Sequence, residues 1–338
     1  MSEIKIACIG CGGIAGGYGQ EPGGHLKNLK KIEGVSIRGL VDINIESARR
    51  RFTQFGGEYY TDDVQKVMKD HEVDAVLICT HHDSHASLII QAAQAGKHVF
   101  VEKPMAMTIQ ECDEIEKVVK KAGIKLQVGF RLRFAPIVRE VKKRIEHPLV
   151  IVGQVMESPW EDHLWAQHPV KGGGNVLSQG CHNFDLVCWL NGSQPESIFA
   201  HGGTLTHKDT DIIDNVVATI RFKNGSIGCV IQGDAGPSGY TSKFFFEVFG
   251  GDKTATLYDR CTKANLRGLD KERLIIDDLS EADQGDPEGT IEELRSFIRI
   301  IRDDSPSPCG VEDGKLATVL IHKAFESIAT GKLQKISV

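Results

Sequence analysis

The stretch that decides the fold is the apolar strand Ile4-Lys-Ile-Ala-Cys-Ile9 and the glycine-rich run Gly10-Cys-Gly12-Gly13-Ile14-Ala15 that follows it directly. The spacing Gly-x-Gly-x-x-Ala after a strand is typical of a dinucleotide-binding turn. Gly10 permits the tight turn, Gly12 lets backbone approach a pyrophosphate, and Ala15 lets helix and strand pack closely. We therefore predict a dinucleotide site here, with Gly13 and Ile14 among its contacts.

Asp42 ends the second predicted strand, Val35–Asp42, and Ile43 follows it. A carboxylate here accepts hydrogen bonds from the adenosine ribose hydroxyls and repels a 2′-phosphate, which favours NAD over NADP. The alternative is an aspartate that caps the following helix. The run Arg49-Arg-Arg51 could hold a 2′-phosphate, but a basic run in a predicted helix is more often a solvated face.

The region between the two strands is longer than this motif usually has. Asp42 lies 27 residues after Ala15, where about 20 is usual. The excess is the stretch 16–24, whose glycines and Pro22 cannot continue a helix. We expect it to interrupt the first helix with a loop near the cofactor.

Strand and helix signals alternate through residue 127. Further apolar strands are predicted at 75–79, 98–101 and 126–128, with helical spacing between them. This alternation predicts an α/β domain over residues 1–127, a doubly wound parallel sheet covered on both faces.

After residue 128 the pattern changes to half-buried strands of period two. In Val216–Phe222 the apolar residues alternate with Val217, Thr219 and Arg221, and Lys223-Asn-Gly225 supplies a turn. Two amphipathic helices follow, one opening at Thr290 and one over 311–328. We predict an α+β domain over residues 128–338 with an open, mostly antiparallel sheet.

Length and charge exclude several classes of function. The 338 residues exceed what one core usually organises, which agrees with two domains. The formal net charge of −6 offers no basic surface for nucleic acid or anionic lipid, so we expect neither as a partner. No targeting segment or membrane span is recognisable, and the nine scattered cysteines are typical of reduced thiols. We expect a soluble, cytoplasmic protein.

Polar residues gather where two predicted parallel strands end. Thr80-His-His82-Asp-Ser-His85 follows the third strand, and Glu102-Lys103-Pro104 follows the fourth. The carboxyl ends of parallel strands are where open sheets bind ligands. A cis Lys103–Pro104 bond costs little and would aim Lys103 into that crevice. A surface lysine in a turn is the alternative.

The order and spacing of these motifs resemble the glucose-fructose oxidoreductase and inositol dehydrogenase (Gfo/Idh/MocA) family. The resemblance covers essentially the whole chain. It rests on Gly10-x-Gly12-x-x-Ala15, Asp42, Thr80 with His85, Glu102-Lys-Pro104, Arg133-Phe134, Gly172-Gly-Gly174, Gly180-x-His182-x-x-Asp185, Glu247-Val-Phe-Gly-Gly251 and Glu312-Asp-Gly314.

The resemblance implies NAD(P)-dependent oxidation or reduction at a hydroxyl-bearing carbon of a sugar or cyclitol. By position, Lys103 would hydrogen-bond the reacting oxygen, His182 would be the general base, and Asp185 would bind a neighbouring hydroxyl. These residue types suit the chemistry, since a base takes the hydroxyl proton and a cation stabilises developing alkoxide. The other expected cofactor contacts are Gly10, Gly12, Gly13, Ile14, Asp42, Ile43, Thr80, His82, His85 and Glu102.

The chain departs from the family pattern at two positions. Ser178 replaces a common aspartate four residues before His182, and a serine orients an imidazole but does not stabilise imidazolium as a carboxylate does. Trp165-Ala166 replaces Trp-Arg before the glycine triplet, which favours a neutral substrate. The expected substrate contacts are Asp185, Ser178, Trp165, Arg131 and His163, the tryptophan offering an aromatic face to a sugar.

Three alternatives remain open. A zinc alcohol dehydrogenase is suggested by Cys8-x-x-Cys11 and the histidines at 81, 82 and 85, but Cys8 falls inside the first strand and no second cysteine pair follows, so we expect no metal. A cofactor-sensing protein would need neither Lys103 nor His182. A glycosidase of the same family would use NAD only for transient oxidation. The favoured hypothesis is an NAD-dependent dehydrogenase of a sugar, glycoside or cyclitol, a homo-dimer or homo-tetramer through its C-terminal sheet.

Overall fold

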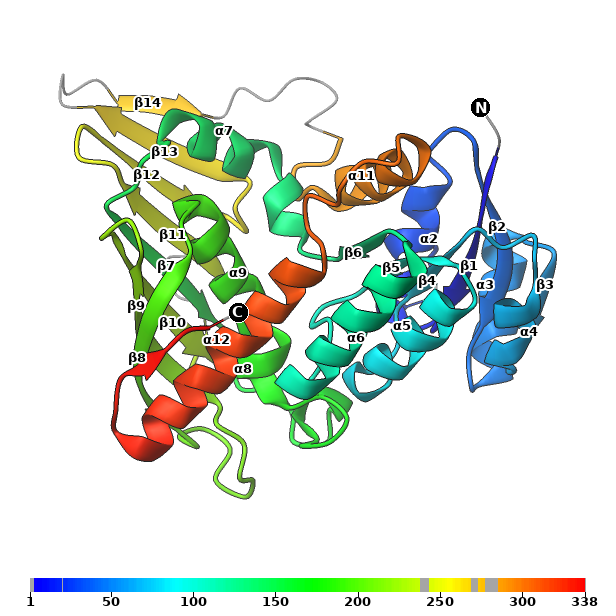
Figure 1. The fold of residues 1–338 in the computed structure, drawn as a ribbon, viewed down its shortest axis with the longest axis horizontal. Helices are drawn as coiled ribbons and strands as arrows, with labels where there is room; N and C mark the ends of the chain where they lie inside the picture. The colour runs from blue at the N-terminus through cyan, green and yellow to red at the C-terminus, as the bar shows by residue number, and fades with distance from the viewer. Residues whose placement is uncertain (1–2, 20, 238–242, 269–272, 277–284, 338) are drawn as a thin grey trace. The chain divides into compact units, whose positions relative to one another are not determined.

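The computed structural model describes residues 3–19, 21–237, 243–268, 273–276 and 285–337 (Figure 1). The chain forms two compact units. The first comprises Met1–Ala106, Gln110–Gly129 and Thr290–Gly314, and the second comprises Met107–Ile109, Phe130–Gly289 and Lys315–Val338. The division differs from a single boundary at residue 128, because a late helix buries Leu294, Phe297 and Ile298 in the core of the first unit.

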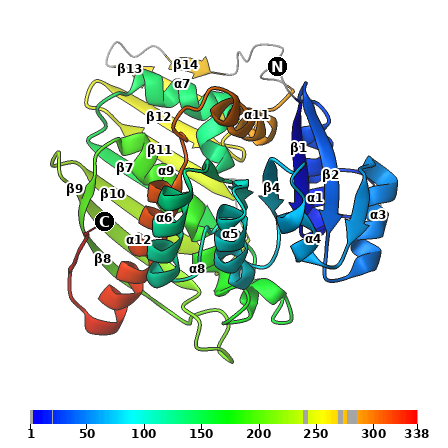
Figure 2. The ribbon, with the colours of Figure 1, turned by 45° about the vertical axis from the view of Figure 1, so that its right-hand side comes forward.

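The first unit is a doubly wound α/β domain, as the strand–helix alternation predicts (Figure 2). Its six strands are all parallel, in the order β3-β2-β1-β4-β5-β6. The strands are β1 (Ile4–Ile9), β2 (Val35–Val41), β3 (Tyr59–Thr61), β4 (Ala75–Ile78), β5 (His98–Val101) and β6 (Leu126–Val128). The order reverses between β1 and β4, which is the switch point where such sheets bind dinucleotides.

Helices lie on both faces of this sheet. They are α1 (Gly13–Gly16), α2 (Gly24–Leu29), α3 (Ile45–Phe55), α4 (Val64–Lys69), α5 (His85–Gln94), α6 (Ile109–Ala122) and α11 (Thr290–Arg302), with the 3-10 turn η1 (His82–Ser84). The predicted interruption of the first helix is confirmed, since α1 stops at Gly16 and α2 begins at Gly24. Gly23 N–H donates to Gly16 O at 2.9 Å and closes the loop between them.

The second unit contains a nine-stranded sheet in the order β14-β13-β12-β11-β7-β10-β9-β8-β15. Only the β7–β10 pairing is parallel, so the prediction of a mostly antiparallel sheet is confirmed for the described residues. The strands are β7 (Val150–Met156), β8 (Pro195–Gly203), β9 (Asn215–Phe222), β10 (Ile227–Gly233), β11 (Phe244–Phe249), β12 (Lys253–Tyr258), β13 (Lys263–Gly268), β14 (Arg273–Ile276) and β15 (Gln334–Lys335).

Helix α9 (Gly180–Asn191) packs on β7 and β10 (Figure 1). Close packing depends on Gly153 of β7, where a Cβ atom would lie 2.3 Å from Asn183 Oδ1. The other helices are α7 (Pro136–Arg144), α8 (Gly174–Ser178) and α12 (Val311–Thr330), with the 3-10 turns η2 (Arg131–Phe134) and η3 (Trp165–Gln167). The buried face of β9 is the predicted one, with Val217, Thr219 and Arg221 exposed.

All nine cysteines lie in the described part of the chain without disulfides, and eight of them are buried. This agrees with the prediction of reduced, hydrophobic side chains. In the same part of the chain, none of the helices combines the length and the hydropathy of a membrane span.

Candidate active site

The glycine run after β1 has the shape of a phosphate-binding turn. Gly10 has φ +91°, and a Cβ atom there would lie 2.5 Å from Cys79 O, so only glycine fits. Gly12 has no atom within 4 Å of the position that a Cβ would take. Backbone is therefore accessible at Gly12, as a bound pyrophosphate requires.

Asp42 lies directly after β2 beside this turn. Its Oδ2 accepts the Cys11 N–H and its Oδ1 accepts the Asn44 N–H, both at 2.8 Å. Each carboxylate oxygen keeps a second lone pair for a ribose hydroxyl. Two exposed apolar side chains offer contact area to an adenosine group. Ile14 follows the glycine turn and is 39% exposed, and Ile43 follows Asp42 and is 96% exposed.

The prediction of a solvated basic face is confirmed for Arg49 and Arg50, which are exposed, and is wrong for Arg51. The side chain is only 1% exposed, and its guanidinium donates to Cys11 O at 3.2 Å and Gly17 O at 2.7 Å. Burial, together with neighbouring Arg50, lowers its pKa. The side chain crosses from α3 to the glycine turn because the Gly17 carbonyl faces it there. Arg51 thus fixes the turn, with its buried guanidinium directed at backbone carbonyls.

The residues after β4 form a compact turn. Thr80 lies on the carboxyl edge of the sheet and shares a hydrogen bond with Ser84 Oγ at 2.6 Å. His85 is fully buried, with Nδ1 2.7 Å from Pro104 O and Nε2 3.2 Å from Thr80 O. Since both ring nitrogens face backbone carbonyls, His85 joins the β4 and β5 turns. His82 is buried against it, with ring centroids 5.7 Å apart.

Glu102 is held by a histidine that lies outside the predicted motifs. His25 Nε2 lies 2.7 Å from Glu102 Oε1, and His25 Nδ1 lies 3.9 Å from Glu293 Oε1. Burial alone would raise the pKa of Glu102, but the hydrogen bond from His25 and the charges of His25 and Lys103 lower it to about 2. His25 opens α2 directly after the 16–24 stretch, and this position was its one sequence signal.

Lys103 follows β5 on the same edge of the sheet as Gly10 and Thr80. Its N–H donates to Glu102 Oε2 at 3.2 Å, and the Lys103–Pro104 bond is cis, which a Lys-Pro sequence permits at little cost. The side chain is half-buried. The first unit therefore presents a cation, a carboxylate and an open glycine turn along one edge.

In the second unit, His182 lies in the first turns of α9. The imidazole is 4% exposed and lies between two aromatic edges, with ring centroids 5.9 Å from Phe130 and 6.0 Å from Phe244. Ser178 is buried at the end of α8. His182 is thus a helical residue whose ring is enclosed by aromatic side chains.

Asp185 forms a buried ion pair with Arg133. The guanidinium donates from Nε to Oδ2 at 2.9 Å and from Nη2 to Oδ1 at 2.5 Å. Both side chains are nearly inaccessible. A two-pronged contact of this kind fixes geometry as well as charge. It joins η2 to α9 next to His182, a structural role that the sequence did not indicate.

The remaining predicted substrate contacts, Arg131, Trp165 and His163, differ in how far their side chains are exposed. Arg131 forms an ion pair with Glu288 at 2.6 Å and lies over the Phe244 ring, 5.5 Å from its centroid. Trp165 begins η3 and is partly buried. His163 is exposed and lies 3.2 Å from Glu161. The structure thus brings Arg131 beside Phe244, which also packs on His182, whereas His163 faces outward.

The thiols of the Cys8-x-x-Cys11 pair are buried and directed at backbone, with Cys8 Sγ 3.4 Å from Gly10 O and Cys11 Sγ 3.5 Å from Val41 O. Within the described ranges, no cluster of three or more histidine, cysteine or acidic side chains has a metal-binding arrangement.

Two family models match the chain. The model described as "Oxidoreductase family, NAD-binding Rossmann fold" matches residues 4–130. The model described as "GFO/IDH/MocA C-terminal domain" matches residues 144–256. Together they cover most of both units.

Individual relatives agree with this result. A myo-inositol 2-dehydrogenase from Thermotoga maritima is 28% identical over 324 residues, covering 90% of this chain and 92% of that protein. A scyllo-inositol 2-dehydrogenase (NAD(+)) from Bacillus subtilis is 28% identical, covering 70% and 69%. Among solved structures, GenD2 from gentamicin A biosynthesis, in complex with NAD, has a TM-score of 0.82 at 19% identity and covers 100% of this chain and 97% of that one; it supports the fold alone.

Proposed function

The chain belongs to the Gfo/Idh/MocA family of NAD-binding oxidoreductases, and on that premise we propose that it oxidises a secondary hydroxyl of a cyclitol or sugar. The single observation that carries the proposal is the carboxyl edge of the six-stranded sheet, where Lys103 and buried Glu102 follow β5 beside an open glycine turn. The inositol dehydrogenases among the relatives favour a cyclitol as the substrate class.

The first unit would hold NAD at this edge. Gly12 and Gly13 would face the pyrophosphate, Asp42 would accept hydrogen bonds from the ribose hydroxyls, and exposed Ile14 and Ile43 would pack on the adenosine. Thr80 would contact the cofactor beside them. We leave His85 out of this set, because its nitrogens already face backbone carbonyls.

Lys103 and His182 would divide the proton chemistry. The Lys103 ammonium would donate a hydrogen bond to the reacting hydroxyl oxygen and stabilise the negative charge that develops there. His182 would take the hydroxyl proton on an imidazole nitrogen, and Ser178 would orient the ring. NAD, when bound, supplies the acceptor for the hydride that leaves the carbinol carbon.

Substrate recognition would come from the second unit. We propose Arg131 and Trp165 as contacts to the hydroxyls and faces of the ring, and retain His163 as a contact for the outer end of a larger substrate. A direct contact from Asp185 is the least supported member of the set, because its carboxylate is nearly inaccessible and paired with Arg133.

The test is a substrate panel with purified protein and NAD. We expect nicotinamide reduction with myo-inositol, scyllo-inositol or a hexose in the panel. Lys103→Ala should abolish turnover while retaining NAD affinity. His182→Asn should remove from the pH profile of kcat the rise that comes from deprotonation of a general base. Absence of both nicotinamide reduction and product across the panel would overturn the proposal. Product formed without net reduction would assign the transient-oxidation chemistry of a glycosidase instead.

We further propose that the nine-stranded sheet mediates a homo-dimer or homo-tetramer. On β9 and β10, Val217 and Ile227 are exposed at 50% and 47%, and such apolar side chains are suited to a subunit contact. Sedimentation equilibrium of the wild type and of Val217→Asp tests this: the variant should shift toward monomer, and a monomeric wild type would refute it.

A further inference from the structure

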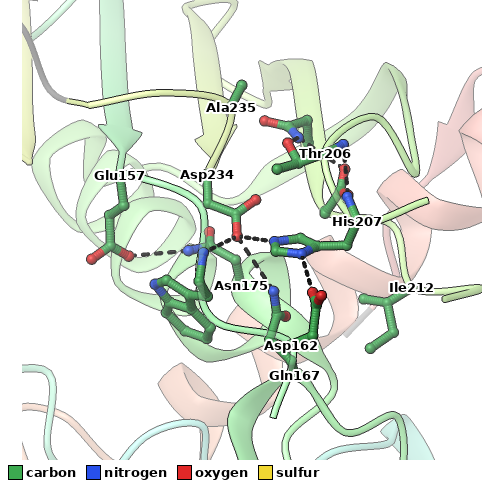
Figure 3. Close-up of polar contacts among 12 residues, drawn as sticks. Glu157, Asp162, Gln167, Asn175, Thr206, His207, Ile212, Asp234 and Ala235 are labelled. Atoms are coloured by element: carbon green, nitrogen blue, oxygen red, sulfur yellow. Dashed lines mark hydrogen bonds and ion pairs between the residues drawn. The ribbon is translucent and has the colours of Figure 1, made fainter. Parts of the chain in front are cut away.

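A buried histidine in the second unit lies between two carboxylates (Figure 3). His207 Nδ1 is 2.9 Å from Asp162 Oδ1, and His207 Nε2 is 2.7 Å from Asp234 Oδ2. Asp234 follows β10 and is completely buried, whereas the Asp162 side chain is 80% exposed. The imidazole thus connects an inner carboxylate of the sheet to an outer carboxylate of the 157–168 loop.

The two contacts together need two protons on the ring. An ionised carboxylate only accepts hydrogen bonds, and a neutral imidazole has one N–H donor and one bare nitrogen. Neutral His207 therefore satisfies one carboxylate and turns a lone pair toward the other. The imidazolium donates to both carboxylates, so two short contacts of this kind favour protonated His207.

The charges around the ring favour the same state. Three carboxylates face His207: Asp162 from the loop, Asp234 from the end of β10, and Asp214, which accepts the His207 backbone N–H at 2.7 Å. Burial lowers the pKa of His207, but the hydrogen bonds and charges of Asp234 and Asp162 outweigh it and raise the pKa.

The same carboxylate anchors other parts of the loop. Asp234 Oδ2 also accepts the Trp160 N–H at 3.2 Å and Gln167 Nε2 at 3.4 Å. A second attachment runs from Glu157, whose Oε2 accepts Asn175 Nδ2 of α8 at 3.0 Å (Figure 3). The 157–168 loop is therefore fixed at both ends and, through Asp162, in its middle.

We propose that His207 is a proton-dependent latch that positions the 157–168 loop and thereby sets the affinity for substrate. The effect on affinity rests on the proposed function, since this loop carries the proposed contacts Trp165 and His163. Loss of the proton leaves one N–H, which buried Asp234 retains because it has no access to water. Asp162 is exposed, so water replaces His207 as its hydrogen-bond partner. The loop then loses the attachment at Asp162.

The direction of the pH dependence follows from the raised pKa. The latched form binds up to one proton more than the detached form in the window between the pKa of His207 paired with Asp234 alone and the higher pKa of His207 paired with both carboxylates. Latching is complete below this window and weakens by up to about tenfold per pH unit within it. Substrate KM should rise over the same window while kcat at saturation changes little.

Two structural measurements on the full chain test the latch without a substrate. Nitrogen NMR of labelled histidines, with the His207 signal assigned by its absence in His207→Asn, should give a pKa above about 6.5. Hydrogen exchange of residues 157–168, corrected for its intrinsic pH dependence, should accelerate across the window. A His207 pKa at or below the ordinary value, or corrected exchange that does not change with pH, overturns the proposal.

A matched pair of variants identifies the contact responsible. Asp162→Asn replaces the carboxylate with an amide, which offers both a donor and an acceptor. The amide can therefore bond His207 in either protonation state, and the exchange profile should flatten. Glu161→Gln removes the adjacent exposed carboxylate and should keep the wild-type profile. Equal profiles for wild type and Asp162→Asn would overturn the latch. Failure to find any substrate would refute the proposed function and leave these measurements intact.

Discussion

The two candidate regions are held in place by different kinds of hydrogen bond, one between backbone groups and the other between side chains. At the carboxyl edge of the six-stranded sheet, backbone hydrogen bonds position the turns: Gly10 N–H donates to Val41 O, and Glu102 N–H donates to Ile78 O. Around α9, hydrogen bonds between side chains position the residues. Arg133 donates to Asp185, and Gln232 Nε2 donates to Asn175 Oδ1 at 2.6 Å. A partly exposed functional side chain of the first region, such as Lys103, can therefore change with little effect on folding, whereas changes in the second region should affect stability first.

Lys103→Met tests the first half of this comparison and should have the largest effect. We expect turnover to fall about 10²- to 10⁴-fold, because the cation beside the reacting oxygen is lost. The free energy of unfolding should change by less than about 0.5 kcal/mol. Lys97→Met is the matched control, since Lys97 is buried and donates to Asp70 O at 2.6 Å. It should lose stability and retain kcat; the opposite pattern would contradict the comparison.

Asp185→Asn tests the second half. The change removes the carboxylate charge of a buried ion pair with Arg133, and we expect a loss of about 3–5 kcal/mol in the free energy of unfolding, measured by urea denaturation. The double variant Arg133→Met/Asp185→Leu removes both charges and should recover most of this loss. A stable single variant with impaired substrate binding would instead make Asp185 a substrate contact.

The Glu102 carboxylate adds an acid-sensitive element to the first region. The pKa of Glu102 in the folded protein is lowered to about 2. Its contribution to the free energy of unfolding is therefore complete above the ordinary pKa of 4.5 and is lost as the pH falls from there through about 2. Wild-type Tm should fall more steeply between about pH 5 and pH 3 than that of Glu102→Gln, which should be about 2 kcal/mol less stable at neutral pH. Parallel Tm curves would show that Glu102 is not held ionised by His25.

Arg51→Met should have the smallest effect, about 1–2 kcal/mol, because it removes hydrogen bonds to the glycine turn. The KM for NAD should rise as the turn loses its support. Arg50→Met is the control, since Arg50 is exposed in the same helix. Chemical denaturation and NAD titration of both variants would show whether side-chain support matters in a region that backbone otherwise holds.

Much of the fold could be predicted because it depends on local pattern. Strand–helix alternation indicated the parallel sheet, period-two burial indicated β9, and Pro22 with its neighbouring glycines indicated the break between α1 and α2. The return of α11 to the first unit could not be predicted. Its apolar stripe would pack equally well on either unit, and only the complete core selects one.

By itself, the sequence determined where backbone must turn and which side chains stand at the strand ends: the glycine run, Asp42 and Lys103. These features depend on residue type and near neighbours. Tertiary structure alone decided that Arg51 reaches the glycine turn, that His25 holds Glu102, that Arg133 occupies Asp185, and that His207 joins Asp162 to Asp234. Each of these pairs is separated by 27 to 77 positions. A charged side chain carries no local signal for its distant partner, because burial, which makes the pairing necessary, exists only in the folded chain.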